Sequence, residues 1–290
     1  MTDLLDIADL DRGNIERILG LSEQDDLGRP LAGKGVALVF EKASARTRNS
    51  MEMAVVQLGG HPVYIQKEEV GLGTRETPED VARTLACYHQ LIAARVTDHG
   101  NLDRMANAVD APVLNMLSDR SHPLQALADL LTLKQLRGSL DGAAVAYVGD
   151  ANNVARSLAE ACAKLGISFR IAAPDGYGFD RDELDRLGAH HREDPRAAVR
   201  GADVVYTDVW TSMGQEDEVD VRRDAFARFQ VDEALMAAAG DQAWFLHCLP
   251  ARRGEEVTDA VMESQRSAVW RQAANRMHTA RGAMAWMLDA

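Results

Sequence analysis

The chain has few cysteines, and their spacing offers no pairing scheme. Cys87, Cys162 and Cys248 lie far apart along the sequence and include no C-x-x-C pair. An odd number of scattered thiols argues against a disulfide framework and against the usual spacing of a structural zinc site.

Long apolar runs and an excess of basic residues are also absent. No stretch approaches membrane-spanning length, and no signal-peptide pattern opens the sequence at Met1 to Leu5. Lys and Arg total 32 against 45 Asp and Glu, which gives a net charge of −13 at pH 7. This balance disfavours nucleic acid and anionic membranes as partners, although it allows a local basic pocket. We expect the protein in the cytoplasm.

The glycine-rich fingerprint of dinucleotide-binding proteins is missing. The segment Gly149-Asp150-Ala151-Asn152-Asn153 stands where G-x-G-x-x-G would stand, but it has one glycine. A nicotinamide-dependent dehydrogenase is therefore disfavoured. The two asparagines suit a zwitterionic amino acid better than a pyrophosphate, or they merely cap the helix that follows.

The sequence does have a regular alternation of strand and helix patterns. The apolar stretches predict strands over 36–40, 62–66, 91–96, 112–115, 143–148, 168–173, 204–207 and 243–247. Helices are predicted over 47–58, 78–88, 122–137 and 154–165, with a loop over 68–77. With 290 residues, 46% of them hydrophobic, the chain can bury two cores. This predicts two parallel-sheet α/β domains, residues 1–136 completed by a C-terminal helix over 275–290, and a Rossmann-like domain over 137–274.

One short segment, Ser44-Ala45-Arg46-Thr47-Arg48, combines hydroxyls and guanidinium groups where a strand hands over to a helix. The free N–H groups of a helix N-terminus attract anions, and the arginines add charge. The alternative is an ordinary helix cap beside solvated arginines.

Three further motifs follow in order along the chain. They are His122-Pro123-Leu124-Gln125, the segment Asp208 to Gly214, and His247-Cys248-Leu249-Pro250. Together with Ser44 to Arg48 and Asn275-Arg276 they make the chain resemble the ornithine carbamoyltransferases of the aspartate/ornithine carbamoyltransferase family, over nearly its whole length. The resemblance implies transfer of the carbamoyl group of carbamoyl phosphate to the side-chain amine of L-ornithine, giving L-citrulline and phosphate, in arginine metabolism. It implies no cofactor and no metal, and a homotrimer or a multiple of trimers.

The resemblance also assigns residues. Those implied to bind carbamoyl phosphate are Ser44, Ala45, Arg46, Thr47, Arg95, His122, Gln125, Cys248, Leu249 and Arg276. Of these, Arg95, His122, Cys248 and Arg276 are the implied catalytic residues. The ornithine head group is implied to bind Asn153, Asp208, Ser212 and Met213.

Simpler interpretations of these residues remain open. Arg95 could be a strand-end arginine paired with a carboxylate, His122 a helix cap, and Cys248 a small core residue. Gly71 stands where many relatives carry a glutamine that reaches a neighbouring subunit, so that contact is in doubt here.

Other functions also remain open. A sister carbamoyltransferase that uses putrescine, an acylated ornithine or aspartate should alter the segment 212–214. A non-catalytic anion-binding subunit should lack Arg46, Arg95 or His122, and all three are present.

Overall fold

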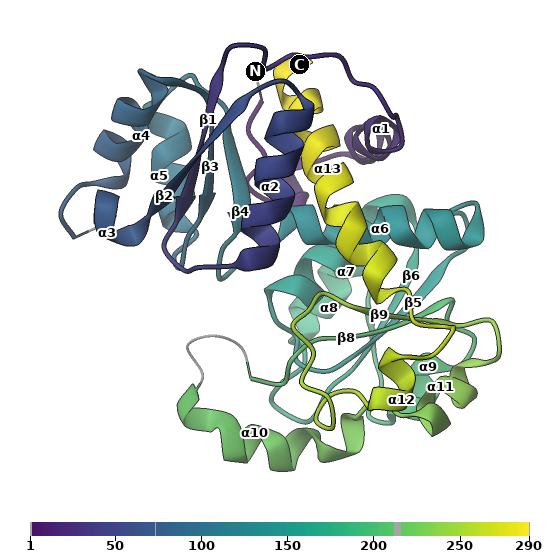
Figure 1. Ribbon diagram of the computed structural model, residues 1–290. Coiled ribbons are helices and arrows are strands. Elements are labelled where there is room, and N and C mark those ends of the chain that lie inside the picture. Colours follow the sequence, from purple (N-terminus) through teal and green to yellow (C-terminus); the bar gives the residue numbers. More distant parts are fainter. Residues whose placement is uncertain (1, 73, 212–215, 290) are drawn as a thin grey trace. The chain divides into compact units, whose positions relative to one another are not determined.

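The chain folds into two compact α/β units, each built on its own parallel sheet (Figure 1). The computed structural model describes residues 2–72, 74–211 and 216–289. Unit 1 comprises Met1–Leu131 and Ala274–Ala290, and unit 2 comprises Thr132–Ala273. The named strands of both sheets pair in parallel, which confirms the predicted fold class of two parallel-sheet α/β domains.

The sheet of unit 1 has the strand order β2-β1-β3-β4. Its strands are β1 (Gly35–Phe40), β2 (His61–Gln66), β3 (His89–Arg95) and β4 (Val113–Leu117). The helices are η1 (Ile7–Asp9), α1 (Arg12–Ser22), α2 (Ala45–Gln57), α3 (Lys67–Val70), α4 (Pro78–Ala86) and α5 (Gly100–Ala108). Two further helices, α6 (Pro123–Arg137) and α13 (Val269–Asp289), cross the boundary between the units.

Alternating side chains of the unit 1 strands pack against helices on both faces of the sheet. Ala37 and Val39 of β1 join a core cluster with residues of α4 and α5, such as Val81 and Met105. The helices α2 and α13 lie on the opposite face (Figure 1). The two-residue period of a strand thus determines which side chains meet which helix layer.

The sheet of unit 2 has the strand order β7-β6-β5-β8-β9. Its strands are β5 (Ala144–Val148), β6 (Ser168–Ala172), β7 (His190–His191), β8 (Val204–Thr207) and β9 (Trp244–His247). The helices are α7 (Asn153–Leu165), α8 (Arg181–Leu187), α9 (Pro195–Val199), η2 (Glu216–Glu218), α10 (Val219–Phe226), η3 (Ala227–Phe229), α11 (Glu233–Ala239) and α12 (Asp259–Met262).

Helix α7 shows how local sequence positions a site in unit 2. Asn152 caps its N-terminus, and Gly166 ends it in the left-handed conformation with φ 70°, which costs glycine little. Leu158 and the other buried side chains of α7 pack on the sheet. The helix therefore starts directly at the carboxyl end of β5.

The predicted loop over 68–77 is wrong at its start. Residues Lys67–Val70 form the short helix α3, because the Glu69 carboxylate accepts the N–H of Gln66 at 2.6 Å and closes the first turn. Gly71 then ends this turn in the left-handed conformation, with φ 57°.

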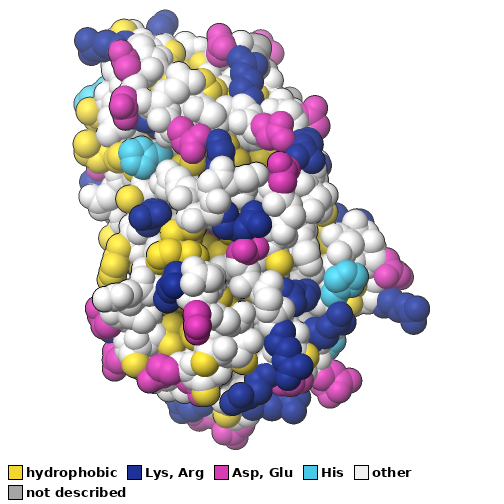
Figure 2. Space-filling view, turned by 90° about the vertical axis from the view of Figure 1, so that its right-hand side faces the viewer, with side chains coloured by type: hydrophobic (Ala, Val, Ile, Leu, Met, Phe, Trp, Pro, Cys, Tyr) yellow, Lys and Arg dark blue, Asp and Glu magenta, His cyan; other side chains and the backbone are white. Residues whose placement is uncertain are grey.

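Charged side chains of both signs are interspersed on the face drawn in Figure 2. Several charged side chains of the described residues form exposed pairs one helical turn apart, such as Arg12 with Glu16 at 2.8 Å, which contribute little to stability. Among the residues that the structure describes, no helix combines the length and the apolar character that a membrane crossing requires.

Candidate functional site

Both sheets contain a point at which successive strands are added on opposite sides. In unit 1 this point lies between β1 and β3, and in unit 2 between β5 and β8. Ligands of open α/β sheets bind beyond the carboxyl ends of the strands at such points. The predicted site residues follow these strands, so each unit carries a candidate binding site.

The unit 1 site is built on the N-terminus of α2. Ser44 is the N-cap, and its Oγ accepts the N–H of Thr47 at 3.3 Å. The helix thus begins at Ala45, two residues before its predicted start at Thr47, and Ala45 and Arg46 occupy its first turn. Backbone N–H groups of this turn have no partner within the helix, so they are available to an anion.

Thr47 joins three segments of unit 1 through one buried hydroxyl. Its Oγ1 accepts hydrogen bonds from Ser44 Oγ at 3.2 Å, from an Arg95 terminal nitrogen at 3.3 Å and from an Arg276 terminal nitrogen at 3.4 Å. Arg95 ends β3, and Arg276 comes from α13. Two guanidinium groups predicted to bind the same substrate therefore converge on the hydroxyl of the α2 first turn.

Arg95 is a buried cation without a carboxylate partner. Only 6% of its surface is exposed, and among the described residues no acidic side chain forms an ion pair with it. Its Nε has no hydrogen-bond partner in that part of the chain. Burial first, and then the positive charges of Arg276 and Arg46, lower the pKa of Arg95 to about 10. The strand-end ion pair considered from the sequence is therefore absent, and the environment of Arg95 favours an anionic ligand.

His122 stands directly before α6 and is also buried. Burial lowers the pKa of its imidazole well below the ordinary value, and the charges of Arg276 and Arg95 lower it further. A histidine with this pKa is neutral at pH 7, so one ring nitrogen carries a proton that it can donate.

Gln125 faces the same arginine. Its Oε1 accepts a hydrogen bond from Arg276 at 2.7 Å, and its Nε2 donates to Asp129 at 2.7 Å. These two partners fix which end of the amide faces the guanidinium groups. Asp129 thus helps to hold the Gln125 amide in this orientation.

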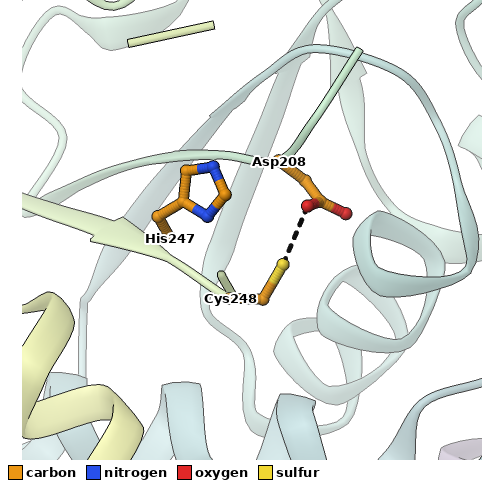
Figure 3. A group of neighbouring side chains, drawn as sticks. All are labelled: Asp208, His247 and Cys248. Carbon is orange, nitrogen blue, oxygen red and sulfur yellow. Dashed lines mark hydrogen bonds between the residues drawn. The ribbon is translucent and has the colours of Figure 1, made fainter. Parts of the chain in front are cut away.

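The unit 2 site centres on the Asp208 carboxylate, which follows β8 and is 8% exposed. Its Oδ1 accepts hydrogen bonds from Cys248 Sγ at 2.9 Å and from the N–H of Val209 at 2.8 Å. Its Oδ2 accepts one from Asn152 Nδ2 at 2.8 Å. Figure 3 shows the Cys248 thiol directed at this carboxylate. Cys248 is thus half-buried and engaged with a polar partner, so it is not merely core filler.

Of the other three residues predicted to bind ornithine, one lies within the described part of the chain. Asn153 opens α7 next to Asn152 and is half-buried. Ser212 and Met213 lie outside the described residues.

His247, the first residue of its motif, and Glu256, which no motif singled out, hold the turn after β9. The Nδ1 of His247 accepts the N–H of Leu249 at 2.8 Å, so a neutral ring carries its proton on Nε2 and donates it to Glu256 at 3.0 Å. Both side chains are fully buried. Leu249 has a left-handed backbone with φ 63°, rare for a residue with a side chain, and the bond from His247 helps to hold it there. An acidic residue nine positions after a histidine is not a signal that sequence reasoning can recognise.

Asp208, His247 and Cys248 also form a group whose potential metal-binding atoms lie within 4.8 Å of one another (Figure 3). Oxygen, nitrogen and sulfur donors of this kind suit zinc. Both ring nitrogens of His247 already form hydrogen bonds, so metal binding there would require breaking one of them.

Fold and sites define a two-unit α/β protein with buried guanidinium groups beyond the strands of one sheet and a buried carboxylate beyond the strands of the other. The family model described as the carbamoyl-P binding domain of aspartate/ornithine carbamoyltransferase matches residues 2–135, and the model of its Asp/Orn binding domain matches residues 141–287. The chain therefore belongs to the aspartate/ornithine carbamoyltransferase family.

Individual relatives agree with this assignment. An ornithine carbamoyltransferase of Thermus thermophilus is 46% identical over 290 residues, covering 99% of this chain and 96% of the relative. One of Acidothermus cellulolyticus is 48% identical over 272 residues, covering 90% and 87%. The crystal structure of the Thermus thermophilus enzyme has a TM-score of 0.92 at 44% identity, covering 99% of this chain and 98% of that one. The Pyrococcus furiosus structure has a TM-score of 0.94 at 42% identity, covering 100% and 97%.

Proposed function

We propose that this protein transfers the carbamoyl group of carbamoyl phosphate to the side-chain amine of L-ornithine, giving L-citrulline and phosphate. The observation that carries this proposal is that the buried Arg95 and Arg276 meet at Thr47, while no acidic side chain in the described part of the chain pairs with Arg95. Such an arrangement suits a small dianion. The names of the relatives and the two matched family models support the same reaction.

In unit 1, the phosphate group would lie at the N-terminus of α2. Ser44, Ala45, Arg46 and Thr47 offer it hydroxyls, first-turn N–H groups and an exposed guanidinium group. A helix N-terminus and a nearby arginine both favour such a group. The substrate would thus bring negative charge to Arg95, which has no acidic partner among the described residues.

The carbonyl end of the substrate would face Arg95 and His122. Attack by an amine places negative charge on the carbonyl oxygen, and fixed donors aimed at that oxygen stabilise the transition state. The neutral His122 can donate a proton in a hydrogen bond without adding a third positive charge. The Oε1 of Gln125, held by Arg276, would accept from the carbamoyl NH₂.

In unit 2, the Asp208 carboxylate would bind the α-ammonium of ornithine, with Asn153, Ser212 and Met213 at the head group. Cys248 would lie beside the reacting amine, and the backbone carbonyl of Leu249 would accept from the carbamoyl NH₂. The uncharged amine forms the new C–N bond, the bond from the carbonyl carbon to the phosphate oxygen breaks, and phosphate leaves with that electron pair. The amine then loses a proton.

The test is an assay of citrulline formation from carbamoyl phosphate and ornithine, with putrescine, N-acetylornithine and aspartate as parallel acceptors. Citrulline formation with little use of the other acceptors is expected. Preferred use of another amine would move the assignment to a sister carbamoyltransferase. No carbamoyl transfer at all, from a folded protein that binds carbamoyl phosphate, would favour the anion-binding subunit.

A homotrimer, or a multiple of trimers, is part of this proposal. Met53 and Val56 project from α2 with 47% and 51% of their surface exposed, and α2 packs beside the edge strand β2. Exposed apolar side chains beside a sheet edge suit a subunit interface. Light scattering measures the mass directly, and substitution of Met53 and Val56 by glutamate should lower it to that of one chain.

A cytoplasmic location also belongs to the proposal. Cys87, Cys162 and Cys248 form no disulfide within the described residues, as suits a reducing compartment. Cell fractionation tests this directly, and recovery outside the cytoplasmic fraction would contradict it.

A further inference from the structure

Asn152 has an amide whose orientation the structure determines completely. Its Oδ1 accepts the backbone N–H groups of Val154 at 2.9 Å and Ala155 at 3.0 Å, and thereby caps α7. Only the oxygen of the amide can accept two N–H donors, so Nδ2 must lie at the other end. That nitrogen donates to Asp208 Oδ2 at 2.8 Å.

The hydrogen bond from Asn152 is the one that holds this second oxygen of Asp208. The N–H of Val209 and the thiol of Cys248 both bind Oδ1, and within the described part of the chain Asn152 is the donor found at Oδ2. The carboxylate can turn about its Cβ–Cγ bond, which moves both oxygens together. The bond from Asn152 at Oδ2 therefore opposes this rotation together with the two donors at Oδ1.

We propose that Asn152 is a positioning residue for the amino-acid acceptor, acting through Asp208; this rests on the proposed function. Asn152 orients the Asp208 carboxylate toward the α-ammonium of ornithine, and it does so from the rigid N-terminus of α7. Both ends of the Asn152 amide bind protein groups, so its role in this proposal is to orient Asp208, whereas Asn153 is the residue proposed to contact the α-carboxylate. The pair Asn152-Asn153 thus divides into an orienting residue and a contacting residue.

The substitution Asn152→Ser separates this role from helix capping. Serine caps helices about as well as asparagine, but its shorter side chain lacks the amide nitrogen with which Asn152 reaches Asp208 while its oxygen caps α7. The matched control is Asp180→Ser, at the N-cap of α8, where the replaced side chain accepts one backbone N–H at 2.8 Å in an exposed position. Both variants should keep a wild-type melting temperature to within a few degrees.

Steady-state kinetics then distinguish the two variants. For Asn152→Ser we expect the KM for ornithine to rise about tenfold or more, since one hydrogen bond to a charged group is lost. The KM for carbamoyl phosphate should stay unchanged, because its predicted site in unit 1 is untouched. Asp180→Ser should leave both KM values at the wild-type level. An unchanged ornithine KM in folded Asn152→Ser would overturn the proposal.

A double-mutant cycle tests whether Asn152 acts through Asp208. If it does, adding Asn152→Ser to an Asp208→Asn variant should change the ornithine kcat/KM by less than about twofold. Additive losses would show that Asn152 contributes by another route and would refute the inference. Absence of citrulline with the wild-type protein is a separate outcome, which would refute the proposed function and this inference with it.

Discussion

Replacing Arg95 by methionine should make the protein more stable and inactive. Lowering the pKa of Arg95 from 12.5 to about 10 corresponds to about 3 kcal/mol against the charged form in the fold, at about 1.4 kcal/mol per pKa unit. The unfolded chain binds this proton more tightly, so folding bears the full cost at every pH below about 10. Methionine has a similar length and no charge. The lost hydrogen bond to Thr47, at 3.3 Å, offsets about 1.5–3 kcal/mol, which leaves a net gain of up to about 1.5 kcal/mol.

Arg281→Met is the matched control, because Arg281 is buried to the same degree, with 7% exposed. Its guanidinium group donates to the backbone carbonyls of Gln24 and Asp25 and to Gln57 Oε1, so its removal loses three hydrogen bonds from a charged donor. We expect this variant to lose at least about 1.5–3 kcal/mol.

Denaturant unfolding and thermal melting, with and without carbamoyl phosphate, measure both effects. Wild-type protein should melt at a higher temperature when carbamoyl phosphate is added, whereas Arg95→Met should not respond and should lose at least about 10²-fold in kcat. A strongly destabilised Arg95→Met would show that Arg95 has a structural partner, and the argument from its isolated charge would be wrong. Retained activity would refute its role at the carbonyl group.

Three further results are expected. Arg46→Ala should lower kcat/KM for carbamoyl phosphate at least tenfold at unchanged stability, since one charge-assisted contact of about 1.5–3 kcal/mol is lost. The control Arg48→Ala, which removes a side chain bound to Glu52 at 2.8 Å, should have a much smaller effect. Equal losses in the two variants would contradict the assignment of Arg46 to the phosphate. Activity should rise from pH 6 to alkaline pH with the fraction of uncharged ornithine amine. The depressed pKa of His122 lies below this range, so an additional acidic limb near pH 6.5, or sensitivity to chelators, would count against the mechanism. Ornithine should be preferred over putrescine by roughly 10⁴-fold in kcat/KM, because a diamine leaves the head-group donors unpaired; comparable use of putrescine would show that Asp208 does not recognise an ammonium beside a carboxylate.

Local features of the fold were readable from the sequence, because local interactions produce them. Strand β8 over Val204–Thr207 lies where its apolar run predicted it. The start of α2 was missed by two residues, since Ser44, Ala45 and Thr47 all fit a first helical turn until the hydrogen bond from the Thr47 N–H identifies Ser44 as the N-cap. Helix α3 was missed for the same reason, since a single carboxylate contact closes it.

The sequence by itself determined the alternation of strands and helices, the two parallel-sheet domains and, through its motifs, the family. Periodicity and capping act over a few residues, so they depend only on neighbouring positions of the chain. Only the tertiary structure decided which polar groups meet. It brought Arg95 and Arg276 to the Thr47 hydroxyl, and in the described part of the chain it gave Arg95 no carboxylate partner. It also joined His247 to Glu256. Finally, it placed Asn152 rather than Asn153 against Asp208. These contacts depend on which strands become neighbours in each sheet, and on the direction in which a buried side chain must point to find its partner. No spacing along the sequence encodes either of them.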